Sequence, residues 1–208
     1  MGILMLEYLG KHYDDLLEAL LEHLQIVAIT LFFSLLLAAF LTIASVYWRR
    51  MGEILIQIFS VLYSVPSLAL FALLIPVTGL GLTTTVIVLT MYNQYLLLRN
   101  FIAGLYGVDP AVTEAAVGLG MSTMQVLVKI RIPLAKKALF TGIQLAVVST
   151  IGIATIAAMI NAGGLGTILF DGLRTLNVNK IIWGSILSAG LALGINGGFQ
   201  ALEKRLGK

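Results

Sequence analysis

Five long, continuously apolar segments constrain the fold of this chain more than any other feature. They span Leu24–Val46, Ile54–Val77, Leu82–Leu98, Ala138–Ile160 and Ile181–Phe199. A helix needs about 20 apolar residues to cross a hydrocarbon core of roughly 30 Å. Because backbone polar groups in lipid must bond within their own segment, the five segments are predicted to be helices. The sequence therefore predicts an all-α polytopic membrane protein with five transmembrane helices in a single domain, residues 1–208.

The composition agrees with a membrane protein and narrows its chemistry. Hydrophobic residues make up 59% of the 208 residues and charged residues only 11%, whereas about a quarter of a soluble domain is charged. The chain has no cysteine, which excludes disulfides and thiolate metal sites, and no metal site is expected. A net charge of +3 is only weak evidence for binding to nucleic acid, so we expect no nucleic acid as partner. The apolar composition leads us to expect a lipid membrane instead.

The distribution of basic residues predicts the orientation of the spans. Cytoplasmic loops carry an excess of Lys and Arg. If the N-terminus lies outside, only Lys11, Arg174 and Lys180 of the 13 basic residues lie on the outer side. The cytoplasmic side then holds Arg49, Arg50, Arg99, Lys129, Arg131, Lys136, Lys137, Lys204, Arg205 and Lys208. We therefore predict an N-out, C-in topology, with a cytoplasmic loop over residues 109–134.

The segment before the first span carries both histidines of the chain. Residues Tyr13–Leu24 have leucines on one helical face and are predicted to form an amphipathic helix. We interpret it as an interfacial helix that leads into the first span. His12 and His23 both fall outside the predicted spans, so a histidine proton relay or metal site has little support.

Residues 109–134 form the longest polar interruption between the apolar segments. Asp109 followed by Pro110 suits an N-cap with proline at the first helical position. The helix that follows is expected to break at Gly118 and Gly120, since glycine commonly ends helices. A short helix and a glycine turn are therefore predicted in the first half of this loop.

The second half of the loop has its own helix start signal. Ser122 and Gln125 have the spacing of a capping box, with Ser122 as N-cap and Gln125 at the third helical position. Pro133 is predicted to end this second short helix or to kink it.

Glu114, Ala115 and Ala116 are the residues of the first short helix that point to a partner. Two small side chains leave a surface that another protein can approach closely. The carboxylate of Glu114 can meet a basic partner or a helix N-terminus. The alternative interpretation is an interfacial linker helix with a solvated glutamate, and the spacing alone favours neither.

The run Glu114-Ala115-Ala116, followed by Gly120 and by Ile132-Pro133, resembles the EAA loop of ABC importer permeases. In that family the loop is a coupling helix that docks into a groove on a cytosolic ATPase. The resemblance implies a type I ABC importer transmembrane domain in the bacterial cytoplasmic (inner) membrane. It implies that the ATPase-coupling positions are Glu114, Ala115, Ala116, Gly118, Gly120 and Pro133.

Two further segments resemble osmoprotectant permeases of the glycine betaine, carnitine and choline type. Residues 65–70 read Val-Pro-Ser-Leu-Ala-Leu and residues 163–166 read Gly-Gly-Leu-Gly, similar to two motifs of that group. The resemblance covers nearly the whole chain and implies a quaternary-ammonium solute. Asn161-Ala162 stands where more glycine is common, so a larger betaine such as ergothioneine is a further candidate. Permeases for an amino acid such as methionine share the five-span plan and are the alternative.

The chain lacks a site that could supply energy. No Gly-x-x-x-x-Gly-Lys-Ser/Thr motif occurs, so no phosphate-binding loop is expected, and we expect neither an enzyme nor a cofactor in this chain. ATP and Mg²⁺ would be bound by the partner ATPase. No charged residue falls near the middle of a predicted span, which disfavours secondary transport. An ATPase-independent membrane channel or scaffold is the alternative from a different class.

The expected partners follow from the same resemblance and from the number of helices. Importers of this type receive solute from an extracytoplasmic substrate-binding protein, and two cytosolic ABC ATPase subunits drive them. Five helices are few for enclosing a solute pathway. A second permease subunit, identical or homologous, is therefore expected to complete the pathway around a two-fold axis.

Aromatic and amide side chains in the spans are candidates for the solute pathway. A quaternary ammonium ion has no N–H donor, so tyrosine faces suit it through cation–π attraction of about 0.5–2 kcal/mol. A proline-broken helix often lines a cavity, although a plain kink is the alternative. Aromatic anchoring, interhelical amide bonds and close packing are the alternatives for the others. The candidates are Tyr63, Pro66, Tyr92, Asn93, Gln94, Tyr95 and Thr155.

Overall fold

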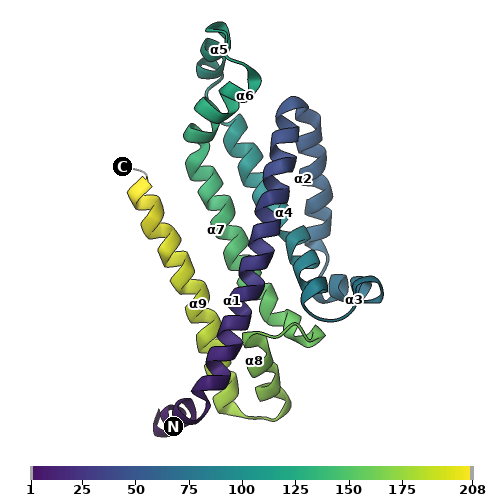
Figure 1. Cartoon of the computed structure of the whole chain (residues 1–208), viewed down its shortest axis with the longest axis vertical. Coiled ribbons are helices and arrows are strands. Elements are labelled where there is room, and N and C mark those ends of the chain that lie inside the picture. Colours follow the sequence, from purple (N-terminus) through teal and green to yellow (C-terminus); the bar gives the residue numbers. More distant parts are fainter. Residues whose placement is uncertain (1, 207–208) are drawn as a thin grey trace.

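The computed structural model describes residues 2–206, which form helices arranged along one long axis (Figure 1). The helices are α1 Gly2–Tyr47, α2 Arg49–Ser64, α3 Ser67–Thr78, α4 Leu82–Tyr106, α5 Pro110–Gly118, α6 Thr123–Val126, a π-helical turn η1 Leu127–Arg131, α7 Ile132–Ala157, a 3₁₀ turn η2 Ala158–Ile160, α8 Leu165–Arg174 and α9 Val178–Leu206. The N-terminus and α8 lie at one end of the axis, and α5 and α6 lie at the other (Figure 1). Every described element is helical, which confirms the predicted all-α class.

α4 lies at the centre of the bundle and packs against α7, α1, α2 and α3. Leu97 and Phe101 of α4 meet Ala38 of α1 and Ala146 of α7 in one cluster. Both alanines are fully buried, since small side chains let helix backbones approach closely. A second cluster joins α3, α4 and the end of α7, with the buried residues Leu70, Phe71, Val88, Tyr92, Ala157 and Ile160.

Three of the described helices are long and apolar enough to cross a membrane, namely Glu7–Tyr47, Thr123–Ile160 and Val178–Glu203. The bent pair Arg50–Ser64 and Ser67–Thr78 adds a fourth if it forms one span. The predicted span Leu82–Leu98 is helical within α4. α4 is not among the helices that are apolar enough, and its polar side chains Thr84, Thr85, Asn93 and Gln94 are buried inside the protein. Three or four spans are thus supported, and a fifth stays a prediction.

The second predicted span, Ile54–Val77, is broken rather than kinked. α2 and α3 meet at a bend of 98°. Pro66 has no N–H to donate, and it restricts Val65 to an extended conformation with φ −71° and ψ 133°. Pro76 lies inside α3 without ending it. The helix break therefore follows from the Val65-Pro66 pair.

The segment before the first span differs from the prediction. The interfacial helix predicted over Tyr13–Leu24 is instead part of α1, whose one kink lies at His12 (φ −127°, ψ 21°). α8 and α9 pack against α1, and Leu16 of α1 is buried in protein. His23 is fully buried within the long apolar helix Glu7–Tyr47, one residue before the predicted first span.

Candidate functional site

α5, the first helix of the loop 109–134, begins at the predicted Asp109 cap and ends at the predicted glycine. The Oδ1 atom of Asp109 accepts a hydrogen bond from the Ala111 N–H over 2.9 Å, and Pro110 occupies the first turn. This cap satisfies one of the free N–H groups at the helix start. α5 ends at Gly118, and Gly120 adopts a positive φ of +85°, which favours glycine. The predicted short helix and glycine turn are confirmed.

The predicted capping box at the start of α6 is also present. The Gln125 N–H donates to Ser122 Oγ over 3.3 Å, and the Ser122 N–H donates to Gln125 Oε1 over 2.8 Å. Two backbone donors at the helix start are thereby satisfied reciprocally. α5 and α6 are thus two capped helices joined by a glycine turn.

Pro133 does not end the second helix, contrary to one of its two predicted effects. The helix continues from Thr123 to Ile160, with a π-helical turn at Leu127–Arg131 just before the proline. The Ile132 N–H donates to the Leu127 carbonyl five residues earlier. A widened turn of this kind accommodates the ring and the missing N–H of the proline. α6 and α7 are therefore joined without a loop.

The α5–α6 end presents apolar side chains and the carboxylates of Asp109 and Glu114 to solvent. Glu114 and Ala115 are exposed, while Ala116 is buried. Leu119, in the turn after α5, is 85% exposed, as befits a contact surface rather than a core. Pro133 lies exposed at the start of α7. The other large exposed apolar side chains of α5 and α6 are Val112, Val117 and Met124.

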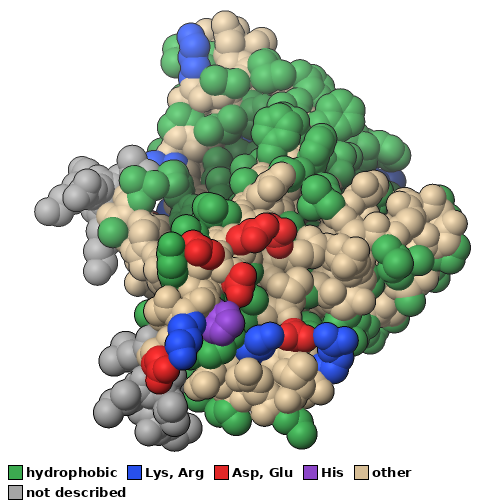
Figure 2. Space-filling model, turned by 60° about the horizontal axis from the view of Figure 1, so that its bottom comes forward, with side chains coloured by type: hydrophobic (Ala, Val, Ile, Leu, Met, Phe, Trp, Pro, Cys, Tyr) green, Lys and Arg blue, Asp and Glu red, His purple; other side chains and the backbone are tan. Residues whose placement is uncertain are grey.

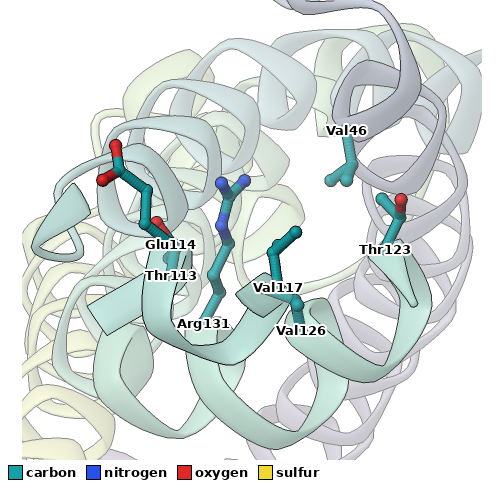
Figure 3. A pocket seen from close by; sticks show the side chains of 7 residues that line it. All are labelled: Val46, Thr113, Glu114, Val117, Thr123, Val126 and Arg131. Carbon is teal, nitrogen blue, oxygen red and sulfur yellow. The ribbon is translucent and has the colours of Figure 1, made fainter. Parts of the chain in front are cut away.

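A hollow of about 340 Å³ lies between α5, α6 and the end of α1 (Figure 3). Its lining residues are Val46, Thr113, Glu114, Val117, Thr123, Val126 and Arg131. The guanidinium carbon of Arg131 lies 5.5 Å from the centre of the Tyr106 ring. The Tyr106 hydroxyl in turn donates to the Ser45 carbonyl over 2.9 Å. From the sequence, Arg131 bears only on the orientation of the spans, because nothing in its spacing indicates a hollow.

The amide candidates of α4 lie inside the bundle and join helices. Asn93 Nδ2 donates to Ser34 Oγ of α1 over 3.1 Å and to Thr150 Oγ1 of α7 over 2.9 Å. Gln94 Nε2 donates to the Ser34 carbonyl over 3.2 Å. Both amides are fully buried. They form a polar layer that joins α1, α4 and α7, which matches the predicted alternative of interhelical amide bonds.

The tyrosine candidates gather beside the break between α2 and α3. The Tyr63 ring centre lies 5.5 Å from that of Tyr92 and 5.0 Å from that of Tyr95. The Tyr92 hydroxyl donates to the Val65 carbonyl, which the broken helix leaves without a helical partner. Pro66 is exposed next to this cluster.

Two other side chains add polar contacts near these candidates. The guanidinium of Arg99 donates to the Tyr95 hydroxyl over 2.8 Å. Thr155 lies on α7, outside the tyrosine cluster, and its Oγ1 donates to the Ile151 carbonyl over 3.2 Å. The structure thus brings together three tyrosines and Pro66, and it places Thr155 elsewhere.

The opposite end of the molecule holds a contact that the sequence did not predict. The Gly164 N–H donates to Glu22 Oε2 over 2.8 Å, and the His23 Nε2 lies 3.1 Å from the Ile151 carbonyl. Gly163 and Gly164 have positive φ values of +85° and +80°, which aim their backbone at α1. The glycine pair predicts a tight turn from the sequence alone. Nothing in the sequence predicts that the turn contacts Glu22, 142 residues away.

Charged side chains gather on this same end, as Figure 2 shows in red, blue and purple. Asp171 of α8 accepts hydrogen bonds from Lys180 and, over 2.7 Å, from Arg174. The ammonium of Lys180 and the guanidinium of Arg174 hold the pKa of Asp171 below its usual range. Within residues 2–206, no three His, Asp or Glu side chains are grouped closely enough to hold a metal ion.

Comparison with known proteins places these features in a family. The chain is 38% identical to the carnitine transport permease protein OpuCB of Listeria monocytogenes over 157 residues, which cover 76% of this chain and 72% of the relative. It is 30% identical to the glycine betaine/carnitine/choline transport system permease protein OpuCB of Bacillus subtilis, covering 97% and 93%.

A solved structure supports the fold independently. A chain of the inward-facing MetNI methionine ABC transporter superposes with a TM-score of 0.83 at 18% identity, covering 94% of this chain and 98% of that one. At this identity the likeness shows the fold alone, which is that of an ABC importer permease. Residues 34–208 match the family described as "Binding-protein-dependent transport system inner membrane component". The chain therefore belongs to that family of inner-membrane permeases, whose members rely on a separate ATPase to hydrolyse ATP.

Proposed function

We propose that this permease belongs to an importer for a quaternary-ammonium osmoprotectant such as glycine betaine, carnitine, choline or a related betaine. The observation that carries the proposal is the similarity, across most of the chain, to permeases named for these solutes. The solved methionine transporter is less similar in sequence, at 18% identity, so methionine is the less favoured solute.

The proposed topology has five spans and an outer N-terminus. The spans are α1, the bent pair α2 and α3, α4, α7 and α9. The positive-inside rule supports this orientation, because Arg99, Lys129 and Arg131 lie toward the α5–α6 end, while Lys11 and Arg174 lie toward the other. The whole chain then forms one permease domain, with residues 109–134 in the cytoplasm.

The α5–α6 end is the proposed docking surface for the cytosolic ATPase. Glu114 offers a carboxylate on the exposed side of α5. The small side chain of the exposed Ala115 lets a partner approach the helix closely. Gly118 ends α5, and Gly120 lies in the turn between α5 and α6. Ala116 of α5 is buried against the rest of the protein. Pro133 lies where α6 passes through the π-turn into α7, so movement of the docking surface would be transmitted directly to a span.

The proposed solute pathway runs beside the break between α2 and α3. Tyr63 and Tyr95 are only half-buried, so their ring faces suit a quaternary ammonium group in transit. Pro66 and the Tyr92 hydroxyl set the backbone at the break. Asn93, Gln94 and Thr155 would contribute by holding α1, α4 and α7 around the path rather than by binding solute tightly.

A second permease subunit, identical or homologous, is proposed to close the pathway. α9 supports this proposal, because only a small share of its apolar window is buried within one chain. An extracytoplasmic binding protein would deliver solute to the end that carries α8 and the Gly163–Gly164 turn.

Reconstitution with the binding protein and the ATPase tests the proposed function. Proteoliposomes would be loaded with ATP and given radiolabelled glycine betaine, carnitine, choline or methionine. Uptake of at least one quaternary-ammonium solute that requires both partners and ATP is the expected result. Uptake of methionine alone would indicate the amino-acid importer, and solute flux without the ATPase would indicate a channel.

A further inference from the structure

Arg131 occupies an unusual position at the α5–α6 end. It lies in the π-turn at the base of the hollow described above, and its side chain points into that hollow (Figure 3). Tyr106 holds the guanidinium through a ring contact at 5.5 Å. The side chain is half-buried, and its Nε atom is buried without a hydrogen-bond partner. A fixed, partly desolvated cation therefore faces an open cavity.

The charge of Arg131 is not neutralised within the part of the chain that the structure describes. Glu114 is the one carboxylate that lines the hollow. Its side chain lies apart from Arg131 in Figure 3, and no ion pair joins the two residues among positions 2–206. A buried guanidinium N–H without an acceptor is costly. The geometry thus calls for an anion from outside the chain.

We propose that an acidic side chain of the partner ATPase enters this hollow and pairs with Arg131. The inference rests on the proposed docking of the ATPase at α5–α6 and adds the chemistry of one contact. Guanidinium groups bind carboxylates in two parallel hydrogen bonds. Val46, Val117 and Val126 line the hollow, and such apolar walls strengthen an ion pair by excluding water.

The position of the hollow favours an ATPase side chain over other anions. Leu119, in the turn after α5, and Met124 of α6 are exposed and would be covered by the same partner. A partly buried pair ringed by apolar contacts is the usual arrangement of an energetically important interface contact. Arg131 would then fix the register of the ATPase, while Glu114 would meet a basic group on it.

Charge reversal at Arg131 tests the proposal, with Lys129 as the matched control. Lys129 lies in the same π-turn but is exposed and does not line the hollow. The dissociation constant of the cognate ATPase would be measured for permease in lipid nanodiscs at low and high salt. Arg131→Glu is expected to weaken binding about tenfold or more, and Lys129→Glu to change it by less than about twofold.

A second variant keeps the test valid if Arg131→Glu disturbs the fold. Val117→Phe narrows the hollow and leaves every charge in place, so it is expected to weaken ATPase binding about tenfold by excluding the acidic side chain. The melting temperature of each variant reports whether the permease itself is intact. Equal binding by wild type, Val117→Phe and Arg131→Glu would overturn the proposal.

Three outcomes would overturn the proposal, and they separate it from the proposed function. If Glu114→Arg restores binding in the Arg131→Glu variant, the partner of Arg131 is Glu114 and not the ATPase. If the wild-type permease itself fails to bind the ATPase, both the docking surface and the ion pair are excluded. If the wild type binds normally and Arg131→Glu leaves ATPase binding unchanged, the ion pair is excluded while the docking surface is retained.

Discussion

The backbone N–H of Gly164 donates a hydrogen bond to the carboxylate of Glu22 over 2.8 Å, joining two positions 142 residues apart. Gly164 adopts a φ of +80° just before α8 begins. A Cβ at this position would lie 2.9 Å from Nδ1 of His23 and 3.3 Å from its Cα. The first helix and the turn before α8 are therefore fitted to each other at a position that only glycine can occupy.

Gly164→Ala is expected to destabilise the permease through both its backbone conformation and its crowding. The backbone conformation of Gly164, φ +80° and ψ −173°, is open almost only to glycine and costs another residue about 1–3 kcal/mol. Overpacking adds about 1–3 kcal/mol. Gly79→Ala is the matched control, because Gly79 has the same φ of +80° but nothing within 4 Å of its Cβ position. Thermal unfolding in detergent should show the larger loss for Gly164→Ala. Equal losses would mean that crowding against His23 is unimportant.

Single cysteines should report the orientation of the chain, which has none of its own. Leu119 and Leu176 are both 85% exposed and lie at opposite ends of the long axis (Figure 1). In intact cells, a membrane-impermeant maleimide is expected to label Leu176→Cys but not Leu119→Cys. Both variants should react after the membrane is permeabilised. The reverse labelling pattern would place the N-terminus inside.

Glu114→Lys is expected to uncouple the permease from its ATPase. Reversing a charge at a docking surface places like charges together and should lower solute uptake about tenfold or more. Transport-coupled ATP hydrolysis should fall in parallel, while membrane insertion is unchanged. Glu53→Lys, at a position on α2 that is also exposed, is the control for the change in charge. Normal coupled uptake by Glu114→Lys would contradict a docking role for α5.

Asn93→Ala should loosen the polar layer inside the bundle. Asn93 bonds both Ser34 and Thr150 on neighbouring helices, and such contacts contribute about 0.6–1.7 kcal/mol in membrane proteins. Asn100→Ala is the control, because Asn100 donates only to the Leu96 carbonyl of its own helix. A double-mutant cycle with Thr150→Val should give a coupling energy for Asn93 and none for Asn100. Absence of coupling would mean that packing alone joins α4 to α7.

Tyr92→Phe should affect the break between α2 and α3 more than Tyr95→Phe does. The Tyr92 hydroxyl is the partner of the half-buried Val65 carbonyl, and losing such a hydrogen bond costs about 0.5–1.5 kcal/mol. The Tyr95 hydroxyl bonds the exposed Arg99 instead. Thermal unfolding and solute uptake, measured for both variants, would separate the two roles. Identical behaviour would show that the break does not depend on Tyr92.

The features that the sequence predicted well are those with local causes. Asp109, Ser122 and Gln125 form the predicted caps because each bonds a backbone group within three residues. The helix break at Pro66 follows from the steric effect of proline on Val65. The family resemblance also rested on short motifs, and the matches to known permeases confirm it.

The features that the sequence did not predict depend on contacts between distant segments. The burial of His23, which directly precedes the apolar run of the first span, comes from Ile151 and Gly164 on distant segments. Pro133 was expected to end or kink a helix, whereas a π-turn absorbs it. The hollow around Arg131 needs the end of α1 as its wall. No periodicity within one segment carries such information.

α6, the π-turn and α7 form one unbroken helix from Thr123 to Ile160. At 1.5 Å per residue, its 38 residues extend about 57 Å, more than the thickness of a bilayer. A displacement applied at one face of the membrane would therefore reach the other as the tilt of a single rigid lever. Release of solute on one side and closure on the other would then be coupled through this one helix.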